Sequence, residues 1–114
     1  MEPINLARSI VETLEDKKGE DILLLDLRNI APVGDYFVIC SGSSDRTITG
    51  LLDAVVDETR EKFHIKPRLE GKPQEGWLLA DFGAVIVHVF SNVQRDYYRL
   101  EDLWSKAKVL VHVQ

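Results

Sequence analysis

The chain has 114 residues, of which 45% are hydrophobic, so it suits one compact domain and leaves no room for a second core. Its formal net charge of -5 argues against a surface that binds nucleic-acid phosphates by itself, because that affinity comes largely from Lys and Arg. A basic protein is the more natural partner, no direct nucleic-acid specificity is expected, and no apolar run approaches the roughly 18 residues of a membrane span.

The first elements expected are a helix and a buried strand. Apolar residues between positions 6 and 14 recur on one helical face, and Gly19 suits the end of that helix. The run 21–27 is short and nearly continuous in apolar content. We interpret it as a strand covered on both faces, although periodicity alone leaves a buried helical turn open.

A second strand and a long helix follow. The run 36–40 is aromatic and β-branched, and the small polar residues 42–45 after it can cap a helix that continues to position 63, despite Gly50 inside it. The lone cysteine, Cys40, lies in the strand, which excludes an intrachain disulfide and favours a buried, inert thiol. Together with a start that lacks a basic and apolar leader, this predicts a cytoplasmic location.

The next segment predicts the outer part of a sheet. Pro67 demotes the run 65–70 to an edge strand, because proline cannot donate to a central ladder. The runs 77–80 and 85–90 are separated by a short turn that contains Gly83, which is typical of an antiparallel hairpin.

The end of the chain predicts a third helix and leaves one strand without an assigned partner. Leu100, Leu103, Trp104 and Ala107 recur at helical spacing, so we expect one helix that docks on the hairpin. Residues 109–113 alternate like a strand. Whether that strand pairs within the domain, across a dimer or not at all stays open.

This order of elements predicts the fold class. Strands and helices in this sequence give an α/β or α+β domain in which a mixed β-sheet is packed by helices. We expect a single domain over residues 1–108, followed by a C-terminal tail, 109–114, as an extra strand.

The carboxylates do not form a catalytic set. Two-metal phosphoryl transfer needs clustered acids that hold cations about 3.5–4 Å apart, commonly two acids that alternate on one strand. Asp26 is flanked by leucines, Asp81 has Leu79 and Gly83 at the alternating positions, and Asp53 lies on an exposed helical face. We therefore expect no catalytic residue and no enzyme, and keep a nucleotidyl-transfer enzyme as the weaker alternative.

Histidine and cysteine spacing gives no metal site either. His64, His88 and His112 are far apart, and none has a neighbouring ligand at the spacing that zinc sites use. His88 lies inside an apolar strand, where a neutral, hydrogen-bonded core histidine is the usual finding. We expect no metal and no cofactor.

Aromatic residues suggest a contact surface. Trp and Tyr are enriched among the residues that dominate binding energy, but core packing is their commoner role. Burial is favoured for Trp104, whereas partial exposure is as reasonable as burial for Trp77 and for one of the adjacent Tyr97 and Tyr98. The acidic residues Glu70, Glu75 and Asp81 lie near Trp77 in the sequence. Exposed aromatic rings beside these acids would complement a cationic partner.

Four segments in combination resemble the Iojap family of ribosomal silencing factors, namely residues 35–44, 76–83, 87–90 and 95–104. The resemblance implies a nucleotidyltransferase-like fold without its catalytic acids and a role on the large ribosomal subunit. It implies binding to large-subunit ribosomal protein fourteen, which would block small-subunit joining and repress translation under nutrient limitation. It also implies a role in large-subunit maturation as the alternative, and pairing as homodimers.

The family's partner-binding surface falls on four residues of this chain. By resemblance these are Trp77, Asp81, Arg95 and Tyr98. His88 and Trp104 match positions that we interpret as structural. Where family members usually carry an acid after the hairpin glycine, this chain has Ala84, which removes one charge from the turn.

Overall fold

A six-stranded mixed sheet forms the centre of the protein, in the order β3-β4-β5-β2-β1-β6. The structure is a computed structural model and describes residues 2–30, 32, 34–103 and 105–114. Strands β2 and β5 are parallel, and every other neighbouring pair is antiparallel. The elements are α1 (Pro3–Asp16), β1 (Glu20–Asp26), β2 (Tyr36–Gly42), α2 (Asp45–Phe63), β3 (Arg68–Lys72), the 3-10 helix η1 (Pro73–Glu75), β4 (Trp77–Asp81), β5 (Val85–Ser91), α3 (Asn92–Tyr98), α4 (Leu100–Leu103) and β6 (Lys108–Val113). The predicted class, a mixed sheet packed by helices, is confirmed.

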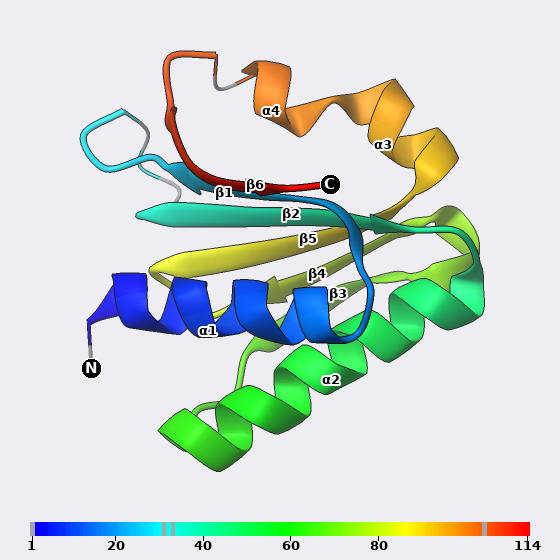
Figure 1. Ribbon diagram of the computed structural model, residues 1–114, viewed down its shortest axis with the longest axis horizontal. Helices are drawn as coiled ribbons and strands as arrows, with labels where there is room; N and C mark the ends of the chain where they lie inside the picture. Colours follow the sequence, from blue (N-terminus) through cyan, green and yellow to red (C-terminus); the bar gives the residue numbers. More distant parts are fainter. Residues whose placement is uncertain (1, 31, 33, 104) are drawn as a thin grey trace.

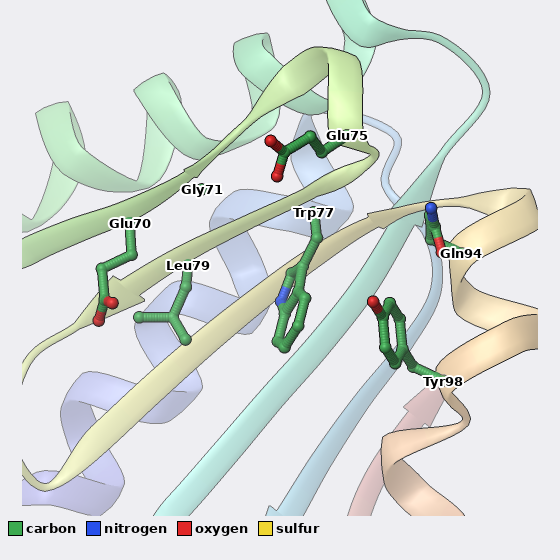
Figure 2. A pocket seen from close by; sticks show the side chains of 7 residues that line it. All are labelled: Glu70, Gly71, Glu75, Trp77, Leu79, Gln94 and Tyr98. Carbon is green, nitrogen blue, oxygen red and sulfur yellow. The ribbon is translucent and has the colours of Figure 1, made fainter.

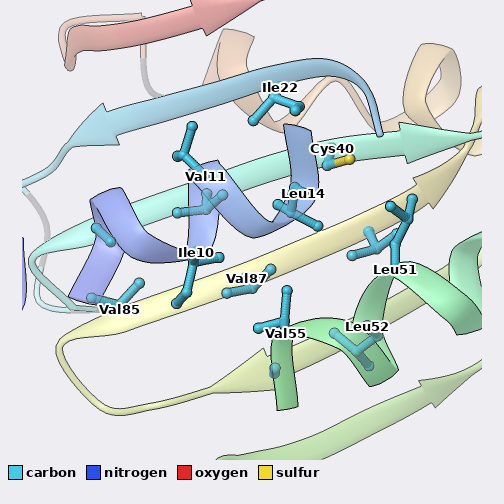
Figure 3. Packing of buried hydrophobic residues seen from close by; sticks show 14 of the residues in the cluster. Ile10, Val11, Leu14, Ile22, Cys40, Leu51, Leu52, Val55, Val85 and Val87 are labelled. Carbon is cyan, nitrogen blue, oxygen red and sulfur yellow. The ribbon is translucent and has the colours of Figure 1, made fainter. Parts of the chain in front are cut away.

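Helices α1 and α2 cover one face of the sheet (Figure 1). Their apolar faces meet strand residues such as Leu24, Val38 and Val87, and the larger of the two buried clusters lies between them (Figure 3). Strand β1 is buried on both faces, as its continuous apolar run predicts. The predicted cap of α2 is also confirmed, because the Ser44 hydroxyl accepts a hydrogen bond from the Thr47 amide at 3.1 Å.

Helices α3 and α4 lie on the opposite face (Figure 1). The second buried cluster there includes Phe37, Ile39 and Phe90, with Leu100 and Ala107 packed against it. Docking of Leu100 and Ala107 on the sheet is therefore confirmed, whereas Trp104 lies outside the described residues.

The prediction of one continuous third helix is wrong. Ser91 caps α3 by accepting a hydrogen bond from the Gln94 amide, and the helix ends at Tyr98. Arg99 then adopts a left-handed conformation with φ of 47°, which ends the helical hydrogen-bond ladder before α4 begins. Helical spacing could not show this break, because the periodic apolar positions begin at Leu100 and therefore all lie after Arg99.

The two edges of the sheet are now defined. Strand β3 forms one edge and starts directly after Pro67, which confirms the predicted edge position. Strand β6, whose partner the sequence left open, pairs antiparallel with β1 within the same sheet. Strands β4 and β5 form the predicted antiparallel hairpin, closed by a hydrogen bond from the Phe82 amide to the Val85 carbonyl.

Candidate functional site

Two of the four predicted contact residues meet beside α3. Strand alternation places Trp77, Leu79 and Asp81 on the face of β4 that α3 approaches, and Tyr98 is the last residue of α3. The ring centroids of Trp77 and Tyr98 are 5.0 Å apart. Trp77 is half-buried, and Tyr98 has 41% of its surface exposed, so both aromatic rings reach solvent.

These two rings form part of a groove of about 410 Å³, which we call the aromatic groove (Figure 2). Trp77 and Leu79 come from β4, and Gln94 and Tyr98 come from α3. Two carboxylates form an acidic rim, Glu70 on the edge strand β3 and Glu75 in the 3-10 helix η1. Its lining residues are Glu70, Gly71, Glu75, Trp77, Leu79, Gln94 and Tyr98. The groove therefore combines an apolar floor with carboxylates on one side.

The two rim carboxylates differ in their pairing. Glu70 lies 3.5 Å from the Arg68 guanidinium, in an exposed ion pair of the kind that contributes little to stability. Glu75 forms no ion pair within the part of the chain that the structure describes. The rim thus keeps negative charge available for a cationic group in the groove.

Gly71 lets the edge strand approach β4 beneath this rim. Its φ is 95°, a backbone conformation that residues with a side chain rarely adopt. A Cβ atom there would lie 2.2 Å from the Trp77 carbonyl oxygen. The backbone contact between β3 and β4 therefore depends on a residue without a side chain.

The Trp77 ring rests on aromatic residues of β5. Its centroid lies 5.2 Å from that of Phe90 and 5.9 Å from that of His88, and its Nε1–H donates a hydrogen bond to His88 Nδ1 at 3.2 Å. Burial lowers the pKa of His88 to about 4, because desolvation disfavours the imidazolium. His88 is therefore neutral at pH 7 and keeps a lone pair for the indole, in agreement with its prediction as a neutral core residue.

Asp81, the third predicted residue, shares the Trp77 face of β4 but lies outside the aromatic groove. The two are four residue steps apart along the strand, a distance of about 13 Å. The Asp81 carboxylate accepts a hydrogen bond from the Gly83 amide at 2.7 Å and one from Arg68 at 3.2 Å. It therefore holds the turn of the hairpin and the edge strand together.

Arg95, the fourth predicted residue, is buried with 5% of its surface exposed. Its Nη2 lies 3.4 Å from Asp21 Oδ2, and the other carboxylate oxygen of Asp21 lies 2.7 Å from His112 Nε2. This carboxylate links α3 to β1 and β6. The Arg95 side chain thus points from α3 toward Asp21 at the start of β1, and it does not line the aromatic groove.

No spacing in the sequence pointed to the contacts of Asp21 and His88. Asp21 stands 91 positions from His112, and the Trp77–His88 bond crosses two strands, so neither pair follows a local spacing rule. Among signals in the sequence, only a histidine within an apolar strand marked one of these residues.

The described residues offer little for catalysis. No group of three or more His, Cys, Asp or Glu within them could hold a metal ion. Burial raises the pKa of the Cys40 thiol to about 12, so the nucleophilic thiolate is scarce at pH 7. None of the described helices is long and apolar enough to cross a membrane.

Comparison with known proteins identifies the family. The family model described as ribosomal silencing factor during starvation matches residues 1–114. The chain belongs to the ribosomal silencing factor family. The resemblance to Iojap-type silencing factors is thereby confirmed, and the family is one of regulatory proteins.

Individual relatives agree with this family. Ribosomal silencing factor RsfS of Bacillus subtilis (strain 168) is 42% identical over 93 residues, which cover 82% of this chain and 79% of the relative. A crystal structure of a Chromobacterium violaceum protein superimposes with a TM-score of 0.86 at 33% identity, covering 97% of this chain and 94% of that chain.

A mouse relative extends the comparison beyond bacteria. The Mus musculus protein named mitochondrial assembly of ribosomal large subunit protein 1 is 31% identical over 102 residues, which cover 84% of this chain and 43% of the relative.

Proposed function

We propose that this chain binds the large ribosomal subunit through large-subunit ribosomal protein fourteen and sterically prevents the small subunit from joining. Translation would fall when nutrients are scarce, and the site of action would be the cytoplasm. Family membership supports a role in ribosome silencing. The partner protein and the mechanism of occlusion are the proposed steps.

The aromatic groove is the observation that carries this proposal. Trp77 and Tyr98 offer large, rigid rings in a concave site, and residues of this kind dominate many interfaces. A Lys or Arg over such a ring gains about 0.5–1 kcal/mol at an exposed site. The Glu75 carboxylate adds attraction at the rim, and its charge would steer a basic ribosomal protein during encounter.

Asp81 and Arg95 take different parts in this proposal. Asp81 extends the acidic surface along β4 toward the hairpin turn and remains a proposed partner contact, while Ala84 beside it supplies no charge. Arg95 would act indirectly: its ion pair with Asp21 fixes the position of α3 and therefore that of Tyr98. Inhibition by occlusion needs no reaction, so we propose a protein without enzymatic activity.

Co-sedimentation with separated ribosomal subunits tests the proposal. We expect the protein to pellet with large subunits, and to reduce their joining to small subunits in a sucrose gradient. Binding to large subunits that leaves joining unchanged would contradict occlusion, and absence from the large-subunit peak would contradict the proposal as a whole.

Substitutions locate the contact surface. Trp77→Ala and Tyr98→Ala should each weaken binding by more than about 1 kcal/mol while the protein stays folded. Leu69→Ala is the control, because Leu69 is an exposed apolar residue on the opposite face of β3, in register with Ala80. Equal losses in all three variants would show that the aromatic groove is not the contact surface.

Large-subunit maturation is the second candidate function. The name of the mouse relative refers to assembly of the mitochondrial large subunit, and maturation would use the same docking surface. Depletion of the protein should then cause precursor particles of the large subunit to accumulate. Homodimer formation, which we also propose from the family resemblance, is measurable by sedimentation velocity.

A further inference from the structure

His88 stands out in the second buried cluster because it is a polar residue among apolar ones. It has 4% of its surface exposed and lies between Ile39 of β2 and Leu79 of β4 in the sheet. Its Nε2 has no hydrogen-bond partner among the residues that the structure describes. An apolar side chain would fill the same place without burying an unpaired polar atom, so packing alone does not explain a histidine here.

The other ring nitrogen makes one directed contact. His88 Nδ1 accepts a hydrogen bond from Trp77 Nε1, and the neutral ring must then carry its proton on Nε2. Trp77 is the diagonal neighbour of His88, since Trp77 pairs with Phe90 and Leu79 pairs with His88. An indole has a single donor, so this bond uses the whole polar capacity of the Trp77 ring.

Stacking cannot replace this bond. The rings of Phe90 and Tyr98 both contact Trp77, with centroids 5.2 Å and 5.0 Å away and 6.1 Å from each other, but ring contacts of this kind set no single direction for the indole N–H. A hydrogen bond depends on direction and therefore fixes which edge of the indole points inward. The opposite edge then faces Tyr98, which also lines the aromatic groove (Figure 2).

We propose that His88 is a positioning residue for partner binding, which holds the indole of Trp77 in its binding orientation through the Nε1–H to Nδ1 hydrogen bond. This inference rests on the proposed function of the aromatic groove. Without the bond, the indole N–H turns to solvent and only a fraction of molecules presents the binding orientation. The apparent Kd rises as the inverse of that fraction.

Three variants test the inference. His88→Leu removes the acceptor and keeps an apolar side chain in the cluster, while His88→Asn retains an acceptor oxygen near the place of Nδ1. Trp77→Phe removes the donor and keeps an aromatic ring. Binding to purified large subunits and the denaturation midpoint are measured for each. The Trp77 indole Nε1–H resonance in a proton–nitrogen NMR spectrum is measured for the native sequence and the two His88 variants, and its loss in Trp77→Phe assigns it.

We expect His88→Leu to weaken binding by about 3- to 10-fold, without a lower denaturation midpoint and with a shifted Trp77 indole resonance. His88→Asn should recover most of the affinity. In the Trp77→Phe background, His88→Leu should change binding by less than about 2-fold, because the bond through which it acts is already gone.

Two results would overturn the inference. One is an equal loss of affinity from His88→Leu in both backgrounds, and the other is unchanged affinity together with a lower midpoint, since each gives His88 a packing role alone. If the unsubstituted chain fails to bind large subunits, the proposed function fails, and positioning for binding fails with it. That outcome is distinguishable because it precedes any substitution.

Discussion

The buried imidazole predicts a specific loss of stability in mild acid. In the folded protein burial lowers the His88 pKa from 6.5 to about 4. Below pH 6.5 the unfolded chain therefore binds a proton that the folded protein refuses, and acid favours unfolding. Above the unfolded-state pKa of 6.5 His88 is neutral in both states and costs no stability. As the pH falls from 6.5 toward the folded-state pKa of about 4, the free energy of unfolding decreases. Linkage gives a loss of about 2 kcal/mol between about pH 7.5 and 5, and about 3 kcal/mol by about pH 4.

Urea denaturation of the native sequence and of His88→Leu across this range measures the effect. Other groups that titrate are common to both proteins, including Asp26, whose pKa is lowered by its hydrogen bond with Arg28. The difference between the two stability curves therefore isolates His88. Parallel curves from pH 7.5 to 4 would refute the reasoning, because they would mean that the folded protein accepts the proton as readily as the unfolded chain.

Three further substitutions test the structure itself. Asp21→Asn keeps a residue suited to the left-handed φ of 49° but removes the charge beside Arg95. We expect the free energy of unfolding in urea to fall by about 1–3 kcal/mol. A change below about 0.5 kcal/mol would contradict the proposed anchoring of α3. Gly50→Ala should stabilise the protein by about 1 kcal/mol, because a Cβ there meets no atom within 4 Å and α2 gains a better helix former. Gly71→Ala should destabilise the protein by more than about 1 kcal/mol, since the new Cβ would collide with the Trp77 carbonyl oxygen. Thermal melting compares the two glycine variants directly. Equal midpoints would refute the backbone conformation assigned to β3.

Local physics explains why much of the fold followed from the sequence. The apolar face of α1, the Ser44 cap of α2 and the hairpin of β4 and β5 all depend on residues a few positions apart. Their signals are periodicity, capping and turn chemistry, which act within a segment. The edge position of β3 followed for the same reason, because Pro67 precedes it directly.

The candidate site was only partly available in the sequence. Trp77 and Tyr98 were expected at a contact surface, and the structure brings them together in one groove with Glu70 and Glu75 on its rim. The burial of Arg95 was not foreseeable, because its charge and its place among mixed charges are typical of an exposed helical face.

Up to the end of β5, the sequence by itself determined which segments become helices and strands and which face of each is apolar, since those properties come from neighbours along the chain; the division between α3 and α4 did not follow from it. The tertiary structure alone decided that β6 pairs with β1, that Asp21 joins Arg95 to His112, and that His88 receives the Trp77 indole. Such contacts join residues on different elements, at separations from 11 positions for Trp77 and His88 to 91 for Asp21 and His112. They depend on strand order, register and the turn at Arg99, none of which leaves a repeating pattern in the amino-acid sequence.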